Sequence, residues 1–192
     1  MKLPEVIGVG GTFASGKDSL AKFLAEKHGY THVSTSDMVR TAAMERYDNV
    51  ERPTLTRTAR ALRDKGGSGI LAEKALETLG RPIVVSGIRT SGEVEAIKNA
   101  DGVMVFVDAD LRVRYQRMQG RARDGEAELP YDDFLAREQR EMEINDDPSD
   151  QNLGVVKNMA DIQLDNSGSL ADFTEKALDA LGQHQTRPTA SE

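Results

Sequence analysis

A glycine-rich segment near the start of the chain carries residue types that bind phosphate. The sequence GTFASGKD at 11–18 matches the pattern G-x-x-x-x-G-K-[ST] at every position except the last, where Asp18 replaces the hydroxyl residue. In such a loop, backbone N–H groups turn inward around a phosphate, and Lys17 brings a mobile charge to the terminal phosphates. An apolar run at 6–9 precedes the loop, and a segment of helical period follows it. This strand–loop–helix context favours a nucleotide site over a flexible turn with a surface lysine.

Arginines recur in three later segments where an anion could be held. Arg40 ends the segment HVSTSDMVR at 32–40, and Arg89 ends VVSGIR at 84–89. Because an arginine fork suits phosphate oxygens, both side chains are candidates for contacts with a substrate phosphate. Five more arginines crowd into a short basic stretch: Arg112, Arg114, Arg117, Arg121 and Arg123. Such a stretch is either an anion-binding segment or a solvated face paired with the acids that follow it.

Alternating strands and helices must position these candidate residues. We expect strands at 5–9, 31–34, 82–87, 102–108 and 160–166. We expect helices at 16–29, 35–47, 54–65, 70–79, 91–99, 109–119, 131–145 and 169–182. The alternation predicts a three-layer α/β domain, in which a five-stranded parallel sheet is covered by helices on both faces. An arginine just past the carboxyl end of a central strand, as Arg89 is, points into the crevice where such sheets bind ligands.

The chain is expected to form one domain at 1–183, because no repeat or linker divides it. The segment 38–80 is long for a single crossover and is interpreted as a helical insertion. The end of the chain is polar, and 184–192 are expected to form a flexible tail.

Composition excludes several classes of protein. The chain has 192 residues, of which 38% are hydrophobic and none is cysteine, so it can bury a core and has no disulfide or thiol chemistry. A net charge of −7 argues against a general nucleic-acid binder. No apolar run reaches the roughly 18 residues of a membrane span, and the first expected strand starts too early for a signal peptide. We therefore expect a cytoplasmic protein with neither a nucleic-acid nor a membrane partner.

The chain resembles the P-loop nucleoside monophosphate kinase superfamily over nearly its whole length. It is most similar to the branch of dephospho-CoA kinase-like and viral deoxynucleotide kinases, where a GKD[ST] loop also occurs. The resemblance implies a P-loop NTPase fold with ATP and Mg²⁺ as cofactors. The residues that it implies around the donor phosphates are Gly11, Ala14, Ser15, Gly16, Lys17, Asp18 and Ser19.

Two segments resemble the acceptor site of these kinases. STSDMVR is similar to the STGDMLR segment of adenylate kinases, which implies that Thr35 and Arg40 contact the acceptor and that Asp37 faces the reaction centre as a base. The apolar strand and glycine before Arg89 match a second acceptor signature, and the insertion 38–80 would form the acceptor cap. The serines of the first segment and Asp37 could equally cap a helix, as such residues usually do.

Two departures from the kinase pattern belong together. Asp18 stands where a metal-binding hydroxyl is usual, and Ser86 stands where a strand-end carboxylate is usual. Mg²⁺ prefers hard oxygen ligands and keeps several waters, so either arrangement can satisfy it. We expect an exchange of roles, with Asp18 and Ser86 at the metal. Ser19 is a weaker candidate because one residue along a helix turns a side chain by about 100°, and Asp108 is held in reserve.

The basic stretch and the chain's last strand resemble the donor end of these kinases. RYQRMQGRARDGE is similar to their lid, which implies a lid at about 117–130 with Arg117, Arg121 and Arg123 on the phosphates. ADIQLDNSGSL resembles the ending common in the dephospho-CoA kinase-like branch, which implies that Asn166 and Gly168 lie near the donor base. A tight strand-to-helix turn explains the same residues equally well.

The resemblance implies an ATP-dependent phosphotransferase that moves the γ-phosphoryl group to a small-molecule nucleotide, a (deoxy)nucleoside monophosphate. Lys17, Asp37, Arg117 and Arg121 are the expected catalytic residues. Two alternatives stay open. One is a dephospho-CoA kinase, which phosphorylates a ribose hydroxyl and would need Asp37 as a base. The other is a nucleotide sensor or slow ATPase that transfers no phosphoryl group; the departures from the kinase pattern at Asp18 and Ser86 suggest it.

Overall fold

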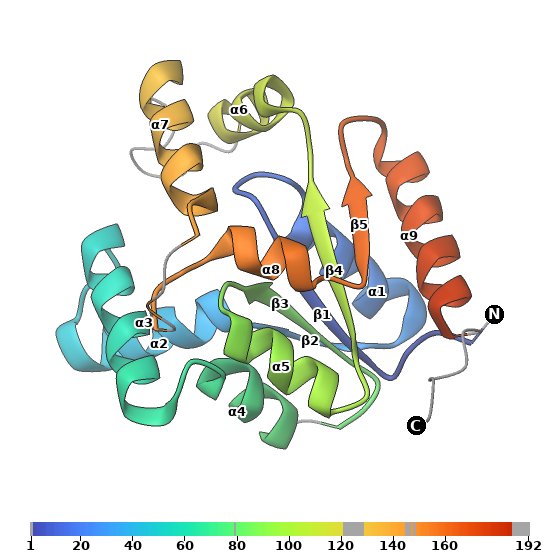
Figure 1. The fold of residues 1–192 in the computed structure, drawn as a ribbon, viewed down its shortest axis with the longest axis horizontal. Coiled ribbons are helices and arrows are strands. Elements are labelled where there is room, and N and C mark those ends of the chain that lie inside the picture. The colour runs from blue at the N-terminus through green and yellow to red at the C-terminus, as the bar shows by residue number, and fades with distance from the viewer. Residues whose placement is uncertain (1, 79, 121–128, 145–146, 148, 186–192) are drawn as a thin grey trace.

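A five-stranded parallel sheet forms the centre of the chain, in the order β2-β3-β1-β4-β5 (Figure 1). The computed structural model describes residues 2–78, 80–120, 129–144, 147 and 149–185. The strands are β1 Val6–Gly11, β2 Thr31–Ser34, β3 Ile83–Ile88, β4 Val103–Asp108 and β5 Ile162–Asp165. All four pairings between neighbouring strands are parallel, which confirms the predicted α/β class and sheet.

Helices link the strands and cover both faces of the sheet. Their bounds are α1 Lys17–His28, α2 Thr35–Tyr47, α3 Arg52–Gly66, α4 Ile70–Thr78, α5 Ser91–Asn99, α6 Leu111–Gln119, α7 Tyr131–Met142, α8 Leu153–Met159 and α9 Leu170–Gln185. Figure 1 shows α6 and α7 standing together beyond the tip of β4, while α2, α3 and α4 lie at the side of the sheet. No helix among the described residues is long and apolar enough to cross a membrane.

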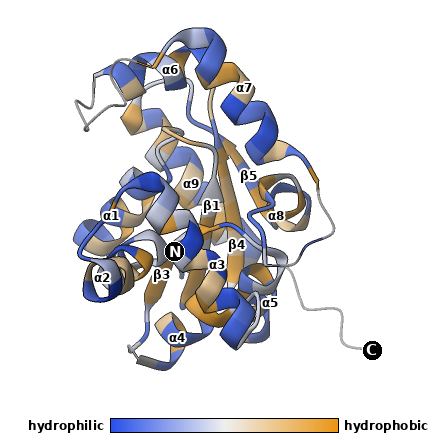
Figure 2. Cartoon of the chain, turned by 90° about the vertical axis from the view of Figure 1, so that its left-hand side faces the viewer, coloured by the Kyte–Doolittle hydropathy of each residue, from blue (hydrophilic) through white to orange (hydrophobic). Residues whose placement is uncertain are grey.

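Each strand divides its side chains between two hydrophobic cores, because successive residues of a strand point to opposite faces. In β4, Val105 packs with α1 and α9 on one face, and Phe106 packs with α5 and α8 on the other. β1 alternates in the same way, with Ile7 in the first core and Val6 in the second. Figure 2 shows the hydrophobic strands at the centre and hydrophilic surfaces on the outer helices. The three expected layers are therefore present.

The helices differ from the expected ones at several positions; α7, for example, ends at Met142 rather than at 145. α8 was not predicted, because its seven residues are too few to show a helical period; it is capped by Asn152, whose side chain accepts a hydrogen bond from the Val155 N–H. α3 begins at Arg52 rather than after Pro53, since a proline in the first turn lacks only an N–H that needs no partner there. α9 runs to Gln185, so the first two residues of the expected tail are helical.

A buried ion pair fixes α3 against α5. Arg63 donates two hydrogen bonds to Glu93 Oε1, at 2.9 Å and 3.3 Å, and the two side chains are 3% and 0% exposed. The second oxygen of Glu93 accepts a hydrogen bond from the Arg89 backbone N–H at 2.7 Å. One carboxylate thus ties the helical segment before β3 to the loop that follows this strand.

Replacing Glu93 with alanine should lower the free energy of unfolding by about 3–5 kcal/mol, because Arg63 would be left buried without a counter-charge. Denaturant unfolding at neutral pH measures this change. Glu95→Ala, an exposed position on the same helix, is the matched control and should change the free energy by less than about 0.5 kcal/mol. Equal stabilities of the two variants would contradict a structural role for the pair.

Candidate functional site

The carboxyl ends of the strands bring the candidate residues to one edge of the sheet. β1 lies between β3 and β4, with β2 beyond β3 and β5 beyond β4. The chain that leaves β1 therefore runs toward one side of the sheet, and the chain that leaves β4 runs toward the other. In open α/β sheets a ligand crevice forms at such a switch point. The segment 12–16 follows β1, Arg89 follows β3, and Asn166 follows β5, while Asp108 ends β4. Parallel pairing therefore unites groups that lie far apart in the sequence.

The glycine-rich loop has the backbone conformation that its sequence requires. Gly16 has φ 98°, a left-handed conformation, and is the N-cap of α1. A Cβ atom at this position would lie 2.2 Å from Nδ2 of Asn166. That amide donates a hydrogen bond of 2.8 Å to the backbone carbonyl of Ser15. Asn166 is 4% exposed and braces the loop from β5, which the sequence did not indicate. That Asn166 and Gly168 lie near the donor base stays a prediction.

The loop holds polar groups that suit an anion. Ser15 Oγ is buried without a hydrogen-bond partner among the described residues. Lys17 is 9% exposed and begins α1, where the first N–H groups of the helix have no partner within it. An anion at this helix N-terminus is stabilised by these N–H groups and by the helix dipole. Gly11 and Ala14 belong to the same loop, and both have positive φ values. These residues lie on one continuous segment from the end of β1 to the start of α1, and their role at the donor phosphates stays a prediction.

Asp108 connects the loop to two further elements. Its Oδ1 accepts a hydrogen bond of 2.8 Å from Thr12 Oγ1, and its Oδ2 accepts one of 3.0 Å from Lys157 Nζ. Nε of Arg114 lies 3.7 Å from Oδ1. Burial alone would raise the pKa of Asp108, but the hydrogen bonds from Thr12, Lys157 and the Ala109 N–H hold it below the usual value. Asp108 and Lys157 line a hollow of about 340 Å³ beside β4 and β5.

The acceptor segments meet at a bulge in β3. Val9 pairs with Ser86 and Gly10 pairs with Ile88, so Gly87 is the extra residue. It has φ 86°, and a Cβ atom there would lie 2.7 Å from Oγ1 of Thr35. Thr35 instead donates a hydrogen bond of 2.8 Å to the Gly87 carbonyl. The bulge thus fixes the start of α2 against the strand end that carries Arg89.

His32 lies among the predicted metal and acceptor residues, although no motif marked it. Its Nε2 is 2.9 Å from Oγ of Ser86, which is completely buried. Burial lowers the pKa of His32, and the carboxylates of Asp18 and Asp37 oppose that shift. His32 therefore contacts Ser86 directly, and the charges of Asp18 and Asp37 act on its ring.

The donor set in this neighbourhood fits the requirements of Mg²⁺. This ion is usually held by one or two protein oxygens together with substrate phosphates and waters. A carboxylate at Asp18 and a hydroxyl at Ser86 are ligands of that kind. Among the described residues no group of three or more histidine or acidic side chains is placed to hold a metal ion, so an all-protein cage is absent from that part of the chain. Which of Asp18, Ser86 and Asp108 would hold the ion stays a prediction.

The other acceptor residues lie on α2. Asp37 and Arg40 are both exposed. The helix cap is Ser34, whose hydroxyl accepts a hydrogen bond of 3.2 Å from the Asp37 N–H. The Asp37 carboxylate is therefore not the cap that the sequence allowed. Arg60, on α3, is paired with Asp147 at 2.7 Å and with Asp150 at 3.0 Å.

The described arginines of the basic stretch differ in burial, and Arg112 is exposed. Arg114 is buried, forms an ion pair with Glu138 and donates to the Ala109 carbonyl at 2.9 Å. Arg117, one turn further along α6, has a buried Nη1 without a hydrogen-bond partner among the described residues. Arg121 and Arg123 lie outside the described residues.

Two arginines that the sequence did not single out lie beside Arg89. Arg137 of α7 places its guanidinium 4.3 Å from the ring centre of Phe13 in the glycine-rich loop. Arg137 and Arg52 both contact Glu141, and so does Arg89, which also donates to Gln151 at 2.6 Å. The sequence gave no signal for this cluster, because 131–145 has the charge pattern of a solvated helix.

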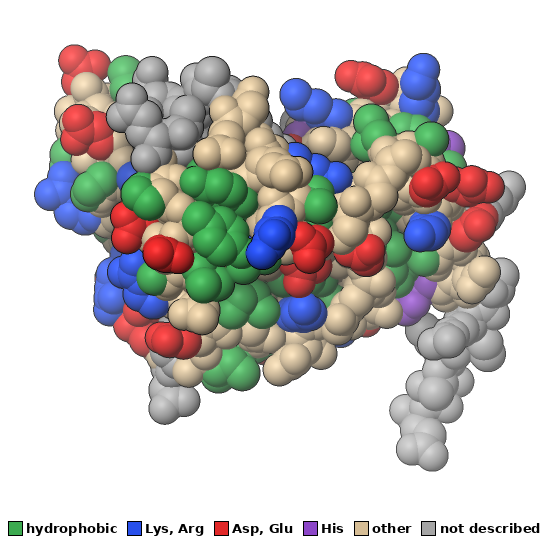
Figure 3. Space-filling view, turned by 90° about the horizontal axis from the view of Figure 1, so that it is seen from above, with side chains coloured by type: hydrophobic (Ala, Val, Ile, Leu, Met, Phe, Trp, Pro, Cys, Tyr) green, Lys and Arg blue, Asp and Glu red, His purple; other side chains and the backbone are tan. Residues whose placement is uncertain are grey.

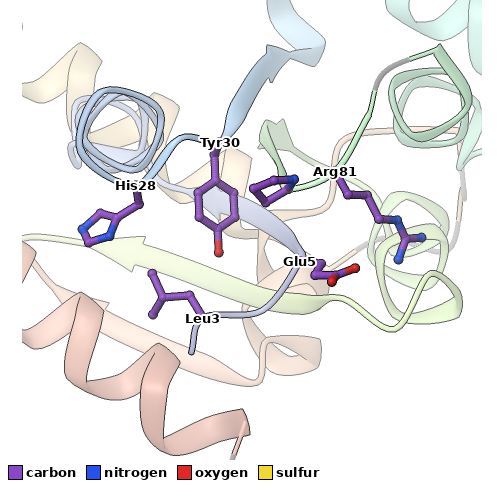
Figure 4. A pocket seen from close by; sticks show the side chains of 6 residues that line it. Leu3, Glu5, His28, Tyr30 and Arg81 are labelled. Atoms are coloured by element: carbon purple, nitrogen blue, oxygen red, sulfur yellow. The ribbon is translucent and has the colours of Figure 1, made fainter. Parts of the chain in front are cut away.

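A second hollow lies at the opposite edge of the sheet. It has a volume of about 350 Å³ and is lined by residues next to the amino ends of β1, β2 and β3, among them Glu5, Tyr30 and Arg81 (Figure 4). The Tyr30 hydroxyl donates to the Pro4 carbonyl, and burial, together with the charge of Glu5, raises its pKa to about 12. Figure 3 looks onto the edge that carries the loop, where the described basic and acidic side chains are mixed. The candidate site lies at that edge.

Comparisons with known proteins agree with this fold. Shikimate kinase from Acinetobacter baumannii, solved in complex with shikimate, has a TM-score of 0.63 and 15% identity over 97% of each chain. An AAA domain model, AAA_18, matches residues 7–146. A UPF0200 protein of Pyrobaculum aerophilum is 35% identical over 143 residues, which are 71% of this chain and 77% of the relative. A UPF0200 protein of Sulfurisphaera tokodaii is 29% identical over 184 residues, 94% and 98% of the two chains.

The chain has the fold of a P-loop NTPase, with the architecture of the P-loop kinases. More particularly, the chain belongs to the UPF0200 family and contains an AAA domain of the AAA_18 type.

Replacing Asp108 with asparagine should destabilise the protein at neutral pH, because Lys157 and Arg114 lose their shared counter-charge. The folded-state pKa of Asp108 lies below the unfolded value of about 3.9, so its contribution is complete above that value. The difference between wild type and variant should therefore shrink as the pH falls through the lowered pKa. Denaturant unfolding at pH 7 and from pH 5 to 3 tests this. Asp101→Asn, at an exposed turn, is the control and should show no such trend.

Proposed function

We propose that this protein is an ATP-dependent phosphotransferase that moves the γ-phosphoryl group of Mg–ATP to a (deoxy)nucleoside monophosphate. The observation that supports this most directly is that the segments proposed for the donor and for the acceptor lie at the same edge of the sheet. The glycine-rich loop supplies the donor cradle, and the β3 bulge holds Arg89 and the start of α2 beside it. A kinase needs both sites side by side, because phosphoryl transfer depends on positioning and on charge neutralisation.

Lys17 and the loop N–H groups are assigned to the donor phosphates, with Arg117 approaching from α6. The buried Nη1 of Arg117, which lacks a hydrogen-bond partner among the described residues, supports this role. An unpaired guanidinium nitrogen gains most from an anion that reaches it, since a buried donor without an acceptor is costly. Arg121 and Arg123 are assigned to the same phosphates on the resemblance alone.

Asp18 and Ser86 are the residues assigned to Mg²⁺, which would neutralise phosphate charge and orient the donor. Arg40 and Arg89 are assigned to the acceptor phosphate. Arg40 is exposed on α2, and Arg89 follows the bulge, so the two approach from different elements. A phosphate acceptor is already ionised at neutral pH, so Asp37 orients the attacking oxygen rather than removing a proton.

A hydroxyl acceptor, as in dephospho-CoA, is the second candidate. It is favoured by one observation: the Asp37 carboxylate is exposed at the start of α2 and is free of the capping bond, which Ser34 makes instead. A general base must reach the hydroxyl proton of its substrate, and an uncapped carboxylate can do so. Arg40 and Arg89 favour the phosphate acceptor over this alternative.

Incubation with Mg–ATP and a panel of ribo- and deoxynucleoside monophosphates plus dephospho-CoA should give one phosphorylated product in step with ADP. Lys17→Ala should lower kcat/KM by about 10²- to 10³-fold, since it removes a charge aimed at the transferring group. Lys27→Ala, exposed at the far end of α1, is the matched control and should leave the rate unchanged. ADP release without any phosphorylated acceptor would sink the kinase assignment in favour of a slow ATPase.

Removing the carboxylate in Asp18→Ala should weaken the apparent affinity for Mg²⁺ by about 10- to 100-fold. Titration of the nucleotide complex with Mg²⁺, followed by turnover and by nucleotide binding, measures the change. Glu26→Ala, exposed on the same helix, controls for the loss of one negative charge. If Asp18→Ala binds Mg–ATP and turns over like wild type, the exchange of roles between Asp18 and Ser86 is wrong.

A further inference from the structure

We propose that Glu141 is an internal counter-anion, which holds Arg52, Arg89 and Arg137 together in the ligand-free protein and gives them up to the anionic group of the acceptor. The inference rests on the proposed function for the identity of that acceptor. It assigns a role in acceptor binding to a carboxylate that no sequence motif marks.

Three guanidinium groups converge on this one side chain. Arg52 Nη2 lies 2.7 Å from Glu141 Oε1, and Arg137 Nε lies 3.1 Å from the same oxygen. Arg89 Nη1 lies 3.6 Å from Oε2. The Glu141 side chain is 13% exposed, so this carboxylate is largely removed from water. A buried carboxylate among three cations is an anion site that the protein fills from its own chain.

The charges leave this cluster attractive to a further anion. Burial alone would raise the pKa of Glu141, but the charges of Arg89, Arg137 and Arg52 and the hydrogen bond from Arg137 lower it. Glu141 is therefore ionised at neutral pH. Three arginines and one carboxylate have a net charge of +2, so the cluster attracts a further anion such as phosphate even before Glu141 is displaced.

The fit of Glu141 within the cluster is incomplete. Its Oε2 is buried and makes no hydrogen bond to a described residue. Arg89 is too far from Oε2 for one and instead gives Nη1 to Gln151 at 2.6 Å. A phosphate group has three oxygens that can accept charge-assisted, bidentate bonds from arginine. Such a ligand would satisfy the guanidinium groups better than the single carboxylate does.

The arginines of the cluster come from three different elements around the candidate site. Arg52 begins α3 in the insertion, Arg89 follows the central strand β3, and Arg137 lies on α7. Arg137 also stacks on Phe13, within the loop that cradles the donor. An acceptor anion that replaces Glu141 would therefore contact the insertion, the sheet edge and the helix beside the donor loop at once.

Two roles for Glu141 make opposite predictions. If it only braces the arginines, its removal disorders them and weakens anion binding. If it competes with the ligand, its removal frees three guanidinium groups and strengthens binding. Inorganic phosphate serves as the probe, because it tests the cluster without requiring phosphoryl transfer or knowledge of the acceptor.

The experiment compares wild type with Glu141→Gln by thermal unfolding at increasing phosphate concentration, with chloride holding the ionic strength constant. Saturating Mg–ADP occupies the donor loop, so that added phosphate cannot bind there. The measurement is repeated in the Lys17→Ala background, which shows whether phosphate binding at the cluster depends on the nucleotide. We expect Glu141→Gln to bind phosphate about five- to tenfold more tightly, although its unfolding midpoint without phosphate falls. Glu143→Gln, an exposed position at the end of α7, is the control for charge and should match wild type.

Adding Arg89→Gln to Glu141→Gln should abolish the gain, which places the bound phosphate at the cluster. Should Glu141→Gln fail to fold by circular dichroism, Glu141→Asp keeps the charge with a shorter reach and should bind phosphate about two- to threefold more tightly than wild type. Unchanged or weaker phosphate binding in the folded variant would overturn the inference. Tighter binding in a protein that transfers no phosphoryl group would overturn only the proposed function.

Discussion

The parallel pairing of β1 with both β3 and β4 is the constraint on which the candidate site depends. Val9 lies beside Ser86 and Gly11 lies beside Val107, so the ends of three strands are level with one another. The segments that follow these strand ends therefore lie next to one another: the glycine-rich loop after β1, Arg89 after β3 and Asp108 at the end of β4. A change of register by one residue would turn the side chains of β3 to the other face of the sheet and separate Arg89 from the loop.

Buried and partly buried carboxylates connect the elements around this edge, and each is paired with cations from elsewhere in the chain. Glu93 joins the insertion to the β3 loop, Asp108 joins the donor loop to α8, and Glu141 joins α3 to α7. Taking such charges out of water is costly unless partners surround them, so these contacts favour one arrangement over many similar ones. An acidic protein thereby gathers its arginines locally, which its net charge does not reveal.

The sequence was sufficient for the fold and for those parts of the site that depend on local pattern. The strands are short buried runs and the loop is a local motif, so β1, the loop and α1 could be predicted with the sheet they belong to. Arg89 was placed at the right edge because a strand end defines its position. The cluster around Glu141 could not be predicted, because its arginines, at 52, 89 and 137, are far apart in the sequence. In addition, a charged residue on a helix gives the same sequence pattern whether its side chain is solvated or buried. His32 and Lys157 were missed for the same reason, since their partners Ser86 and Asp108 are distant in the sequence.

The bond from the Asn166 amide to the Ser15 carbonyl has a consequence for synthesis of the chain. The stretch that matches the AAA domain model ends at residue 146, twenty residues before this asparagine (166 minus 146). A fragment cut at that boundary would contain the whole glycine-rich motif but not the side chain that supports it. During synthesis the glycine-rich motif likewise leaves the ribosome long before Asn166 does. The Asn166 side chain can support the loop only once β5 has joined the sheet, and β5 is the last strand of the chain to be synthesised.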